Sequence, residues 1–396
     1  MKTYDILRDN EIIQIDEYKN IKKKYNAIVK FATENVKWYK EHFGKDTDII
    51  TKEDLRNNFD ELLSDNTTKD TIDMTTTGST GIPLTTRWTK YEYNCATMEV
   101  WKYRIANGAT FNSPIIYFNG NPNVNNMIAR IEEISKNSYR FDRVFTDDAT
   151  REYLRFLKNK SNAILYGSSS TIYNFALAIE RINERCSGIS CIELNGEVVL
   201  QHEYNQIKET FNTKIINNYG AREVWPIAIT CEYGHLHVNN TVYLENIENS
   251  NDILVTSLIK KRQPLIRYKI GDIGKVEWCR CKCGRTSQMV LDLVGRKNDY
   301  LYVSKNKKIH WSIISRPIID YVVKHPNNIK EFYIHQHKDL SIILYIVPGS
   351  NYSIKDNDFL YDMLIKMLGN LSIKVIVISS IKQNRRGKRI YLQCDV

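Results

Sequence analysis

Apolar residues near the start of the chain recur at the spacing of one helical face. Between about residues 17 and 43 this pattern predicts one long amphipathic helix, with Ile21, Tyr25, Ile28, Phe31, Ala32, Val36 and Tyr39 on its apolar side. A shorter helix is expected after Thr51, because Asp54 stands three residues later as in an N-terminal cap; it should run to about Leu63. The glycine- and hydroxyl-rich run 75–83 then predicts a loop.

The middle of the chain alternates between apolar strand-like runs and helical patterns. A helix is predicted at about 90–106, and buried strands at 113–118, 163–166, 189–194 and 214–217, with a helix from about 169 to 184. This alternation predicts an α/β sheet with crossover helices. Ligands bind beyond the strand ends of such sheets, so loops 166–168 and 195–197 are predicted to contact a ligand, the second through Asn195, Gly196 and Glu197.

The last third of the chain changes character twice. From about 238 to 294 the pattern becomes short β segments, including 252–256 and 273–278, which predict an appended β subdomain. A polar linker is expected at 295–299. The remainder predicts a small α+β domain, with helices at 313–323 and 359–368 and strands at 331–335, 340–347 and 373–378. We therefore expect an α/β protein with two domains, 1–295 and 296–396.

Composition narrows the classes of protein to consider. The 396 residues are enough for two or more domains, and no apolar run is long enough for a transmembrane helix. The polar start of the chain does not resemble a secretory signal, so a cytoplasmic location is expected. A formal net charge of +10 favours anionic partners, which leaves nucleotides, nucleic acid and an anionic membrane surface open.

Five stretches carry residues suited to nucleotide chemistry. Glycines and hydroxyls in Thr76-Thr77-Gly78-Ser79-Thr80-Gly81-Ile82-Pro83 suit a loop around phosphate oxygens, although Leu84 stands where a Walker loop would need a lysine. The others are Tyr219-Gly220-Ala221-Arg222-Glu223, Tyr268-Lys269-Ile270-Gly271-Asp272, Gly295-Arg296 and Gly387-Lys388. Each alone is more simply explained by a turn, a core aromatic or a solvated basic surface.

In this order and spacing, the five stretches resemble the adenylate-forming superfamily of acyl-CoA synthetases, peptide-synthetase adenylation domains and luciferases. The chain is most similar to the phenylacetate-CoA ligase and CapK-like capsule-biosynthesis branch. The segments 38–43, 50–55 and 264–268 support that branch.

The resemblance implies roles for these residues. Thr76, Thr77, Ser79 and Thr80 would hold the β- and γ-phosphates of ATP, with Gly78 and Gly81 permitting close approach. Tyr219, beside Gly220, would stack on adenine, Glu223 would hold Mg²⁺, Asp272 would bind the ribose hydroxyls, and Arg296 would lie at a hinge near ribose or phosphate. Lys388, from a mobile C-terminal domain, would reach the carboxylate and the α-phosphate.

The chain departs from the family pattern at three places. The usual threonine-glutamate pair is Arg222-Glu223 here. The hinge residue is either Asn298 or Asp299. Lys388 stands among three arginines, Arg385, Arg386 and Arg389, so other cations are close to it in sequence.

The cysteine distribution predicts a metal site. In a cytosolic chain a tight cysteine cluster favours a metal over disulfides. Two short segments, 231–237 and 279–284, hold more Cys and His residues than one tetrahedral zinc needs. The predicted structural Zn²⁺ ligands are Cys231, His237, Cys281 and Cys283, with His235 and Cys279 as replacements; the alternative is a set of reduced surface cysteines.

The resulting functional hypothesis is an AMP-forming acid ligase that uses ATP and Mg²⁺ and passes the acyl group to CoA, a carrier-protein thiol or an amine. A role in capsular polysaccharide synthesis follows from the branch resemblance only. Two alternatives remain: a non-catalytic or nucleic-acid-binding protein with the same fold, and a member that binds ATP without activating an acid. Peripheral association with a membrane is also compatible with the charge.

Overall fold

The structure is a computed structural model of the chain. It describes residues 11–44, 48–64, 70–76, 84–118, 131–135, 137–197, 199, 201–296, 300–305, 307–310, 314, 317–318, 321, 325, 327–369, 371–381 and 391–396. The chain divides into two compact units. The first comprises Met1–Phe111 and Ile216–Val294, and the second comprises Asn112–Ile215 and Gly295–Val396.

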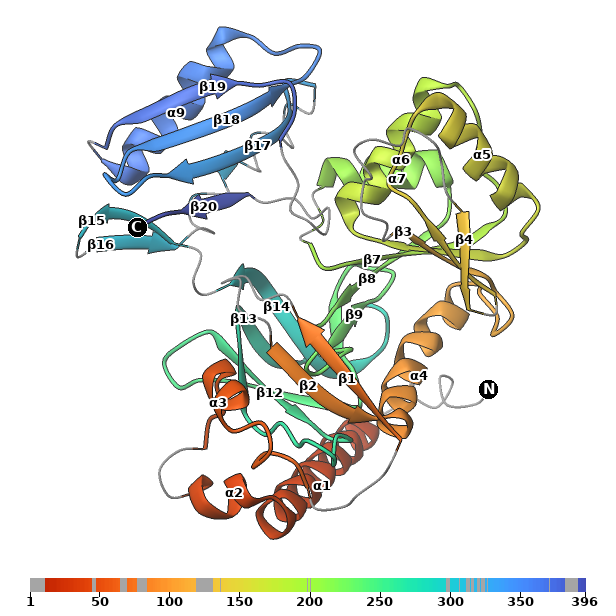
Figure 1. Ribbon diagram of the computed structural model, residues 1–396, viewed down its shortest axis with the longest axis vertical. Coiled ribbons are helices and arrows are strands. Elements are labelled where there is room, and N and C mark those ends of the chain that lie inside the picture. The colour runs from red at the N-terminus through yellow and green to blue at the C-terminus, as the bar shows by residue number, and fades with distance from the viewer. Residues whose placement is uncertain are drawn as a thin grey trace. The chain divides into compact units, whose positions relative to one another are not determined.

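The first unit is built on a mainly antiparallel sheet with strand order β11-β12-β13-β14-β10-β9-β8 (Figure 1). In chain order these strands are β8 (Lys214–Tyr219), β9 (Ala228–Thr230), β10 (Leu236–Val238), β11 (Val242–Asn246), β12 (Asp252–Ser257), β13 (Tyr268–Arg280) and β14 (Thr286–Arg296). A separate hairpin joins β1 (Thr71–Thr76) to β2 (Leu84–Thr89). The helices of this unit are α1 (Glu11–Asn35), α2 (Lys37–His42), α3 (Lys52–Asn57) and α4 (Lys90–Ala106).

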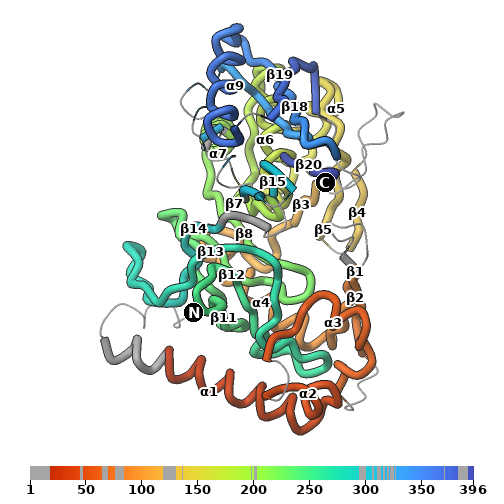
Figure 2. The backbone as a smooth tube through the Cα atoms, turned by 90° about the vertical axis from the view of Figure 1, so that its left-hand side faces the viewer, coloured from red at the N-terminus to blue at the C-terminus, as the bar shows by residue number. Residues whose placement is uncertain are grey.

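The predicted helix at 17–43 is two helices, α1 and α2 (Figure 2). Val36 separates them with an extended backbone, φ −127° and ψ 122°, and forms a β-bridge with Ser64. The long-range bridge therefore overrides the helical pattern at this residue. The cap predicted at Thr51 is present, because Thr51 and Asp54 form a reciprocal capping box, but α3 ends at Asn57 rather than near Leu63.

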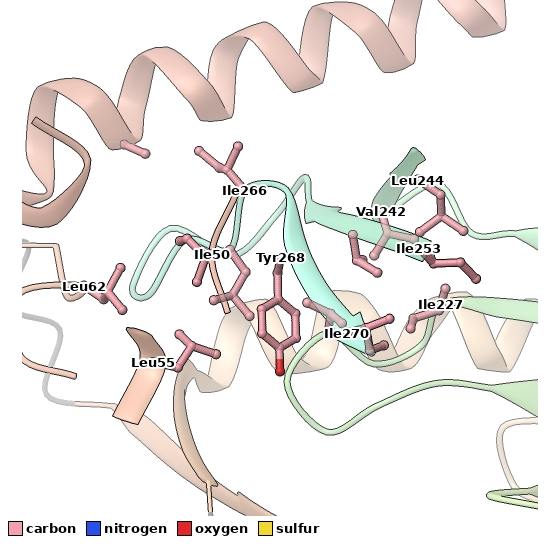
Figure 3. Close-up of a cluster of buried hydrophobic side chains, with 14 of the residues drawn as sticks. Ile50, Leu55, Leu62, Ile227, Val242, Leu244, Ile253, Ile266, Tyr268 and Ile270 are labelled. Atoms are coloured by element: carbon pink, nitrogen blue, oxygen red, sulfur yellow. The ribbon is translucent and has the colours of Figure 1, made fainter. Parts of the chain in front are cut away.

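The core of the first unit forms around Tyr268 at the start of β13. Figure 3 shows Tyr268 with Ile50, Leu55, Ile266 and Ile270 around it. All five side chains are at most 3% exposed. This packing fixes the beginning of the strand that also carries Asp272.

The second unit contains a largely parallel sheet with strand order β7-β6-β3-β5-β4. The strands are β3 (Ile115–Phe118), β4 (Ile131–Ser135), β5 (Ser138–Phe141), β6 (Ala163–Gly167) and β7 (Ile189–Asn195), and the helices are α5 (Asp147–Lys158), α6 (Ser169–Arg181) and α7 (Gln201–Phe211). Strands β5, β3, β6 and β7 pair in parallel. The prediction of a parallel sheet with crossover helices is confirmed.

The C-terminal residues form a small α+β structure within this second unit. Its sheet has the order β19-β18-β17-β20, from β17 (Ile329–Gln336), β18 (Ile342–Pro348), β19 (Ile373–Val377) and β20 (Leu392–Cys394). Helix α9 (Ile354–Leu368) packs on it through Leu360, Leu364 and Leu368, and a hairpin pairs β15 (Tyr300–Ser304) with β16 (Lys307–His310). The expected mixed α/β fold with a smaller C-terminal part is confirmed.

Two details differ from the sequence expectation in this region. The expected linker at 295–299 begins inside strand β14, which continues to Arg296; residues 297–299, including Asn298 and Asp299, lie outside the described residues. Helix α9 starts at Ile354 instead of about 359, because Ser353 and Asp356 form a capping box there. None of the described helices combines the length and the apolar character needed to cross a bilayer.

Candidate functional site

The predicted phosphate loop is the connection of a β-hairpin. Strands β1 and β2 pair from Thr71↔Thr89 to Thr76↔Leu84, so Thr75 and Thr76 belong to a strand and not to the loop, which corrects the expectation. The Thr75 and Thr85 hydroxyls lie 3.0 Å apart across the hairpin. The remaining predicted loop residues, Thr77, Gly78, Ser79, Thr80 and Gly81, lie outside the described residues.

Arg222 contacts this hairpin near the end of β1 that leads into the loop. Its Nη1 donates a hydrogen bond of 2.9 Å to the backbone oxygen of Thr75. The turn after β8, which carries Glu223, is thereby joined to the strand that leads into the hydroxyl-rich loop. The structure thus brings together two residues that are 147 positions apart in sequence.

Tyr219 and Asp272, predicted to contact adenine and ribose, are hydrogen-bonded to each other. The hydroxyl of Tyr219, the last residue of β8, donates to Asp272 Oδ2 at 2.8 Å. Burial raises the pKa of Tyr219 well above its usual value, and the Asp272 carboxylate raises it further, so the hydroxyl keeps its proton as a donor. The pair holds an aromatic face and a carboxylate in one fixed arrangement.

Glu223 is buried, with 5% of its surface exposed, and is held by a tyrosine and a lysine. The hydroxyl of Tyr268 donates to Glu223 Oε1 at 3.1 Å, and Nζ of Lys260 donates to the Glu223 backbone oxygen at 3.2 Å. A carboxylate fixed by a hydrogen bond on one oxygen is typical of a metal ligand oriented by its surroundings. Glu223 therefore fits the role of holding Mg²⁺ beside bound phosphates.

Lys260 is a functional candidate that the sequence interpretation missed. Its ammonium is fully buried, 4.7 Å from the centre of the Trp88 ring of β2, and the buried carboxylates of Glu92 and Glu223 act on its charge. Burial lowers the pKa of Lys260 to about 7. In sequence it stands in a Lys-Lys-Arg run, which is typical of a solvated surface, so only tertiary packing distinguishes it from Lys261.

Two positions in the predicted nucleotide-binding stretches require glycine, Gly271 and Gly220, and the structural reason differs between them. Gly271 adopts a φ of +90°, a conformation that favours glycine at the bend before Asp272. Gly220 is required for packing instead, because a Cβ there would lie 2.7 Å from Cδ1 of Trp225. The predicted contact of Gly220 with the nucleotide stays a prediction.

In the second unit, the two predicted ligand loops lie next to each other at the ends of parallel strands β6 and β7. Asn195 Nδ2 donates to the Gly167 oxygen at 3.3 Å, and Glu197 Oε2 accepts from the Ser170 amide at 3.2 Å. Gly196, with a φ of +71°, makes the turn between them. The Glu197 carboxylate therefore stabilises the amino end of α6, and a contact of this loop with a ligand remains a prediction.

The structure does not describe the side chains of two predicted cationic residues, Arg296 and Lys388. The backbone of Arg296 ends β14, but its side chain is not among the described ones. Lys388 belongs to the segment 382–390, which also lies outside the described residues. Their predicted roles at the hinge and at the α-phosphate are therefore not tested.

The four predicted zinc ligands come together in the first unit. The ligand atoms of Cys231, His237, Cys281 and Cys283 all lie within 4.8 Å of one another. Three of these residues are buried and Cys283 is partly buried. Three thiols and one imidazole have the chemistry of a structural zinc site, and together they make a tetrahedral set of four ligands.

Two matching turns present these ligands. In each turn, the backbone oxygen of the first cysteine accepts a hydrogen bond from the amide of the glycine three residues later. Gly234 donates to Cys231 at 2.9 Å, and Gly284 donates to Cys281 at 3.0 Å. The amides of Cys231 and Cys281 donate to the oxygens four residues on, at 3.0 and 2.8 Å. Both glycines have positive φ, +77° and +87°, so each turn requires glycine at that position. The ligand geometry is thus set by short hairpins.

Neighbouring polar groups orient the ligands. Nδ1 of His237 lies 2.7 Å from the Ser287 hydroxyl, which leaves Nε2 toward Cys283 at 3.4 Å. Burial, followed by the charges of Arg285 and His235, lowers the pKa of His237 to about 3, so the imidazole is neutral as a metal ligand must be. Nε of Arg285 donates to the Cys283 sulfur at 3.4 Å.

The two replacement ligands differ in position. Nδ1 of His235 lies 3.1 Å from the Cys281 sulfur, so it adjoins the cluster. The Cys279 thiol lies 3.9 Å from a Glu277 carboxylate oxygen and is not in the four-residue group. The geometry favours the first predicted set over one that contains Cys279.

Comparison of the whole chain with known structures identifies its architecture. A crystal structure of 2-hydroxyisobutyryl-CoA ligase in the postadenylation state, in complex with 2-HIB-AMP, matches with a TM-score of 0.70 over 95% of this chain and 89% of that one, at 14% sequence identity. The chain has the fold of the acyl-adenylate-forming CoA ligases. Anthranilate CoA ligase AuaEII in complex with anthranoyl-AMP also matches, with a TM-score of 0.53 over 80% of this chain and 65% of that one, at 12% identity. The predicted resemblance to the adenylate-forming superfamily is thereby confirmed at the level of the fold.

Sequence comparison agrees with the predicted branch. Protein CapK of Staphylococcus aureus is 24% identical over 359 residues, which cover 86% of this chain and 78% of that protein. No protein-family model matches the chain.

Proposed function

We propose that this protein is an AMP-forming acid ligase that activates a carboxylic acid with ATP. The observation that carries the proposal is the hydrogen-bonded pair of Tyr219 and Asp272 beside the Glu223 turn, in a chain with the fold of ligases that bind acyl-adenylates. In this proposal the Tyr219 ring stacks on adenine and Asp272 binds the ribose hydroxyls. Glu223 would hold Mg²⁺, which supplies positive charge to the phosphates when bound.

The proposed reaction joins a carboxylate oxygen to the α-phosphorus and breaks the bond from that phosphorus to the bridging oxygen of pyrophosphate. Lys388 is proposed to stabilise the negative charge of the transition state. The hydroxyl-rich loop, which follows the strand that Arg222 contacts at Thr75, is proposed to bind the β- and γ-phosphates. The acyl group then passes from AMP to a nucleophile, and the enzyme needs no covalent intermediate.

The acceptor we favour is a thiol of CoA, with a carrier-protein thiol or an amine as alternatives. A related 2-hydroxyisobutyryl-CoA ligase structure is in complex with both 2-HIB-AMP and CoA, which supports this choice. The narrower proposal of a cytoplasmic step in capsular polysaccharide synthesis rests on the resemblance to the CapK-like branch. We further propose that Cys231, His237, Cys281 and Cys283 hold a structural Zn²⁺, because four protein ligands leave no open position for catalysis.

The test is ATP–pyrophosphate exchange with a panel of aromatic, fatty, amino and uronic acids. At least one acid should support exchange, and Asp272→Asn should raise the KM for ATP about 10-fold, since a ribose hydrogen bond to a charged group is worth about 1.5–3 kcal/mol. Glu248→Gln, an exposed carboxylate in the turn between β11 and β12, is the control and should leave KM unchanged. No exchange with any acid, together with salt-sensitive binding of nucleic acid, would overturn the proposal in favour of a binding protein.

A further inference from the structure

A second group of metal-binding side chains lies in the C-terminal part of the chain, apart from the cysteines. The ligand atoms of His335, His337 and Asp395 all lie within 4.8 Å of one another. The centroids of the two imidazole rings are 4.1 Å apart, and Nε2 of His335 lies 2.7 Å from Asp395 Oδ2. Nothing in the proposed ligase chemistry uses this group.

Strand pairing brings these three side chains to one face of the sheet. Side chains alternate between faces along a strand, so His335 of β17 and His337, the residue after the strand's last, Gln336, share a face. Strand β20 runs parallel to β17 with His335 opposite Gln393, and the Asp395 amide donates to the Gln336 oxygen at 3.0 Å. Asp395, two residues after Gln393, therefore falls beside His337.

The backbone of the group is fixed on both sides. His337 opens the turn to β18: its amide donates to the Ser341 oxygen and its oxygen accepts from the Leu340 amide, each at 2.9 Å. On the other side, β20 is held by its parallel pairing with β17 over Leu392, Gln393 and Cys394. The three ligands are thus presented by the ordered ends of two neighbouring strands.

A hydrogen-bonded chain orients the carboxylate. Gln393 Nε2 donates to Asp395 Oδ1 at 3.0 Å, and the Tyr333 hydroxyl donates to Gln393 Oε1 at 2.8 Å. With Oδ1 occupied by Gln393, Oδ2 is directed at the histidines, as in metal sites whose carboxylates are held by outer hydrogen bonds.

The group is reachable from solvent. The His335 side chain is 18% exposed and that of Asp395 is 33% exposed. An ion can therefore enter and keep water molecules as additional ligands. Ligands about 2 Å from one ion lie about 3–4 Å apart, so small side-chain rotations suffice to bring the three atoms around an ion.

We propose that His335, His337 and Asp395 bind one divalent transition-metal ion, with zinc as the reference ion and water completing its coordination. Imidazole and carboxylate ligands suit Zn²⁺, Ni²⁺ and Cu²⁺ and select against Mg²⁺ and Ca²⁺, which prefer oxygen ligands throughout. The bound ion links β17 to β20, the strand that follows residue 390.

The experiment is a titration of the metal-free full-length protein with Zn²⁺, read by calorimetry and by metal content after gel filtration. The wild type should bind one equivalent more than His335→Ala/His337→Ala. Asp395→Asn, which keeps a similar shape, should weaken the additional binding about 10–100-fold, as for loss of a ligand or its support. Asp362→Asn, an exposed carboxylate on α9, is the control and should bind as the wild type does.

A second measurement separates this group from the cysteine cluster. Cys281→Ser/Cys283→Ser should retain the binding that is lost in the double histidine variant, and its Co²⁺ form should lack the sulfur-to-cobalt charge-transfer absorption. If the double histidine variant binds as much Zn²⁺ as the wild type, or if Cys281→Ser/Cys283→Ser binds none, the proposal is wrong.

Discussion

Two clusters of chemistry-bearing residues in the first unit are organised in opposite ways. The ligands at 231–237 and 281–283 are presented by two short turns with the same internal hydrogen bonds, each closed by a positive-φ glycine. In the Tyr219, Glu223 and Asp272 cluster, Glu223 is instead held by Tyr268 and Lys260, which are distant from it in sequence, and the neighbouring Arg222 bonds to Thr75 of β1. The first arrangement is suited to rigid metal binding, and the second to binding a ligand that bridges several elements.

Because the two clusters are organised differently, substitutions in them should have different effects. Changes in the cysteine cluster should alter stability and metal content, while changes around Glu223 should alter the kinetics of adenylation. Four variants test that separation.

The largest effect is expected for Lys388→Ala. If this lysine stabilises the transition state, the rate of ATP–pyrophosphate exchange should fall by about 10²–10³-fold, the usual loss on removing one such group. The melting temperature should not change. Arg389→Ala is the matched control, and an equal loss in that variant would assign the effect to the basic segment as a whole.

The next effect is expected for Cys281→Ser. Loss of a structural zinc ligand should remove the metal and cost at least about 3 kcal/mol, which corresponds to about 6–12 °C in melting temperature for a unit of this size. Chelation of the wild type should produce the same shift. Cys186→Ser, at a cysteine of the second unit, is the control; an unchanged melting temperature and zinc content in Cys281→Ser would contradict the site.

Lys260→Met should have an intermediate effect on activity. The variant removes the hydrogen bond that fixes the Glu223 backbone, so we expect kcat/KM for Mg·ATP to fall about 10-fold. Stability should also fall, because the variant removes a buried positive charge that faces the buried carboxylates of Glu92 and Glu223. The control is Lys261→Met, whose exposed ammonium contacts only the Phe31 ring among the described rings. Equal activity of the two variants would show that Lys260 does not position Glu223.

The smallest effect is expected for Tyr268→Phe. The change deletes only the hydroxyl that donates to Glu223 Oε1 and keeps the ring in the core of Figure 3. Loss of about 1 kcal/mol should raise the Mg²⁺ concentration for half-maximal activity about fivefold. Tyr243→Phe, at a half-buried ring stacked edge-on against Tyr25, is the control. A change in melting temperature without a change in Mg²⁺ dependence would assign Tyr268 to packing alone.

Much of the fold was predictable because its signals are local. The capping residues Thr51 and Asp54 and the apolar strands of the parallel sheet declare themselves within a few residues. The hairpin of β1 and β2 was not predicted, because its polar alternation, Thr71 to Thr76, is typical of a loop. The break at Val36 was missed for a related reason, since a bridge to Ser64 decides it.

The candidate site also has a part that could be predicted from the sequence and a part that could not. Its residue types and order were visible in the sequence, including the four clustered metal ligands and the order of Tyr219, Glu223 and Asp272. The supporting residues were not. Lys260 and Lys261 are adjacent lysines in sequence, yet one is fully buried and the other is exposed.

The sequence by itself determined much of the local structure and chemistry of this protein: the capping residues, the apolar strands of the parallel sheet, and the residue types suited to phosphate, ribose or metal. Only the tertiary structure decided which residues meet, as with the Arg222 side chain and the Thr75 backbone oxygen, or with the side chains of His335 and Asp395. The physical reason is that local conformation follows from nearby residues, whereas burial and long-range hydrogen bonding depend on how whole elements pack.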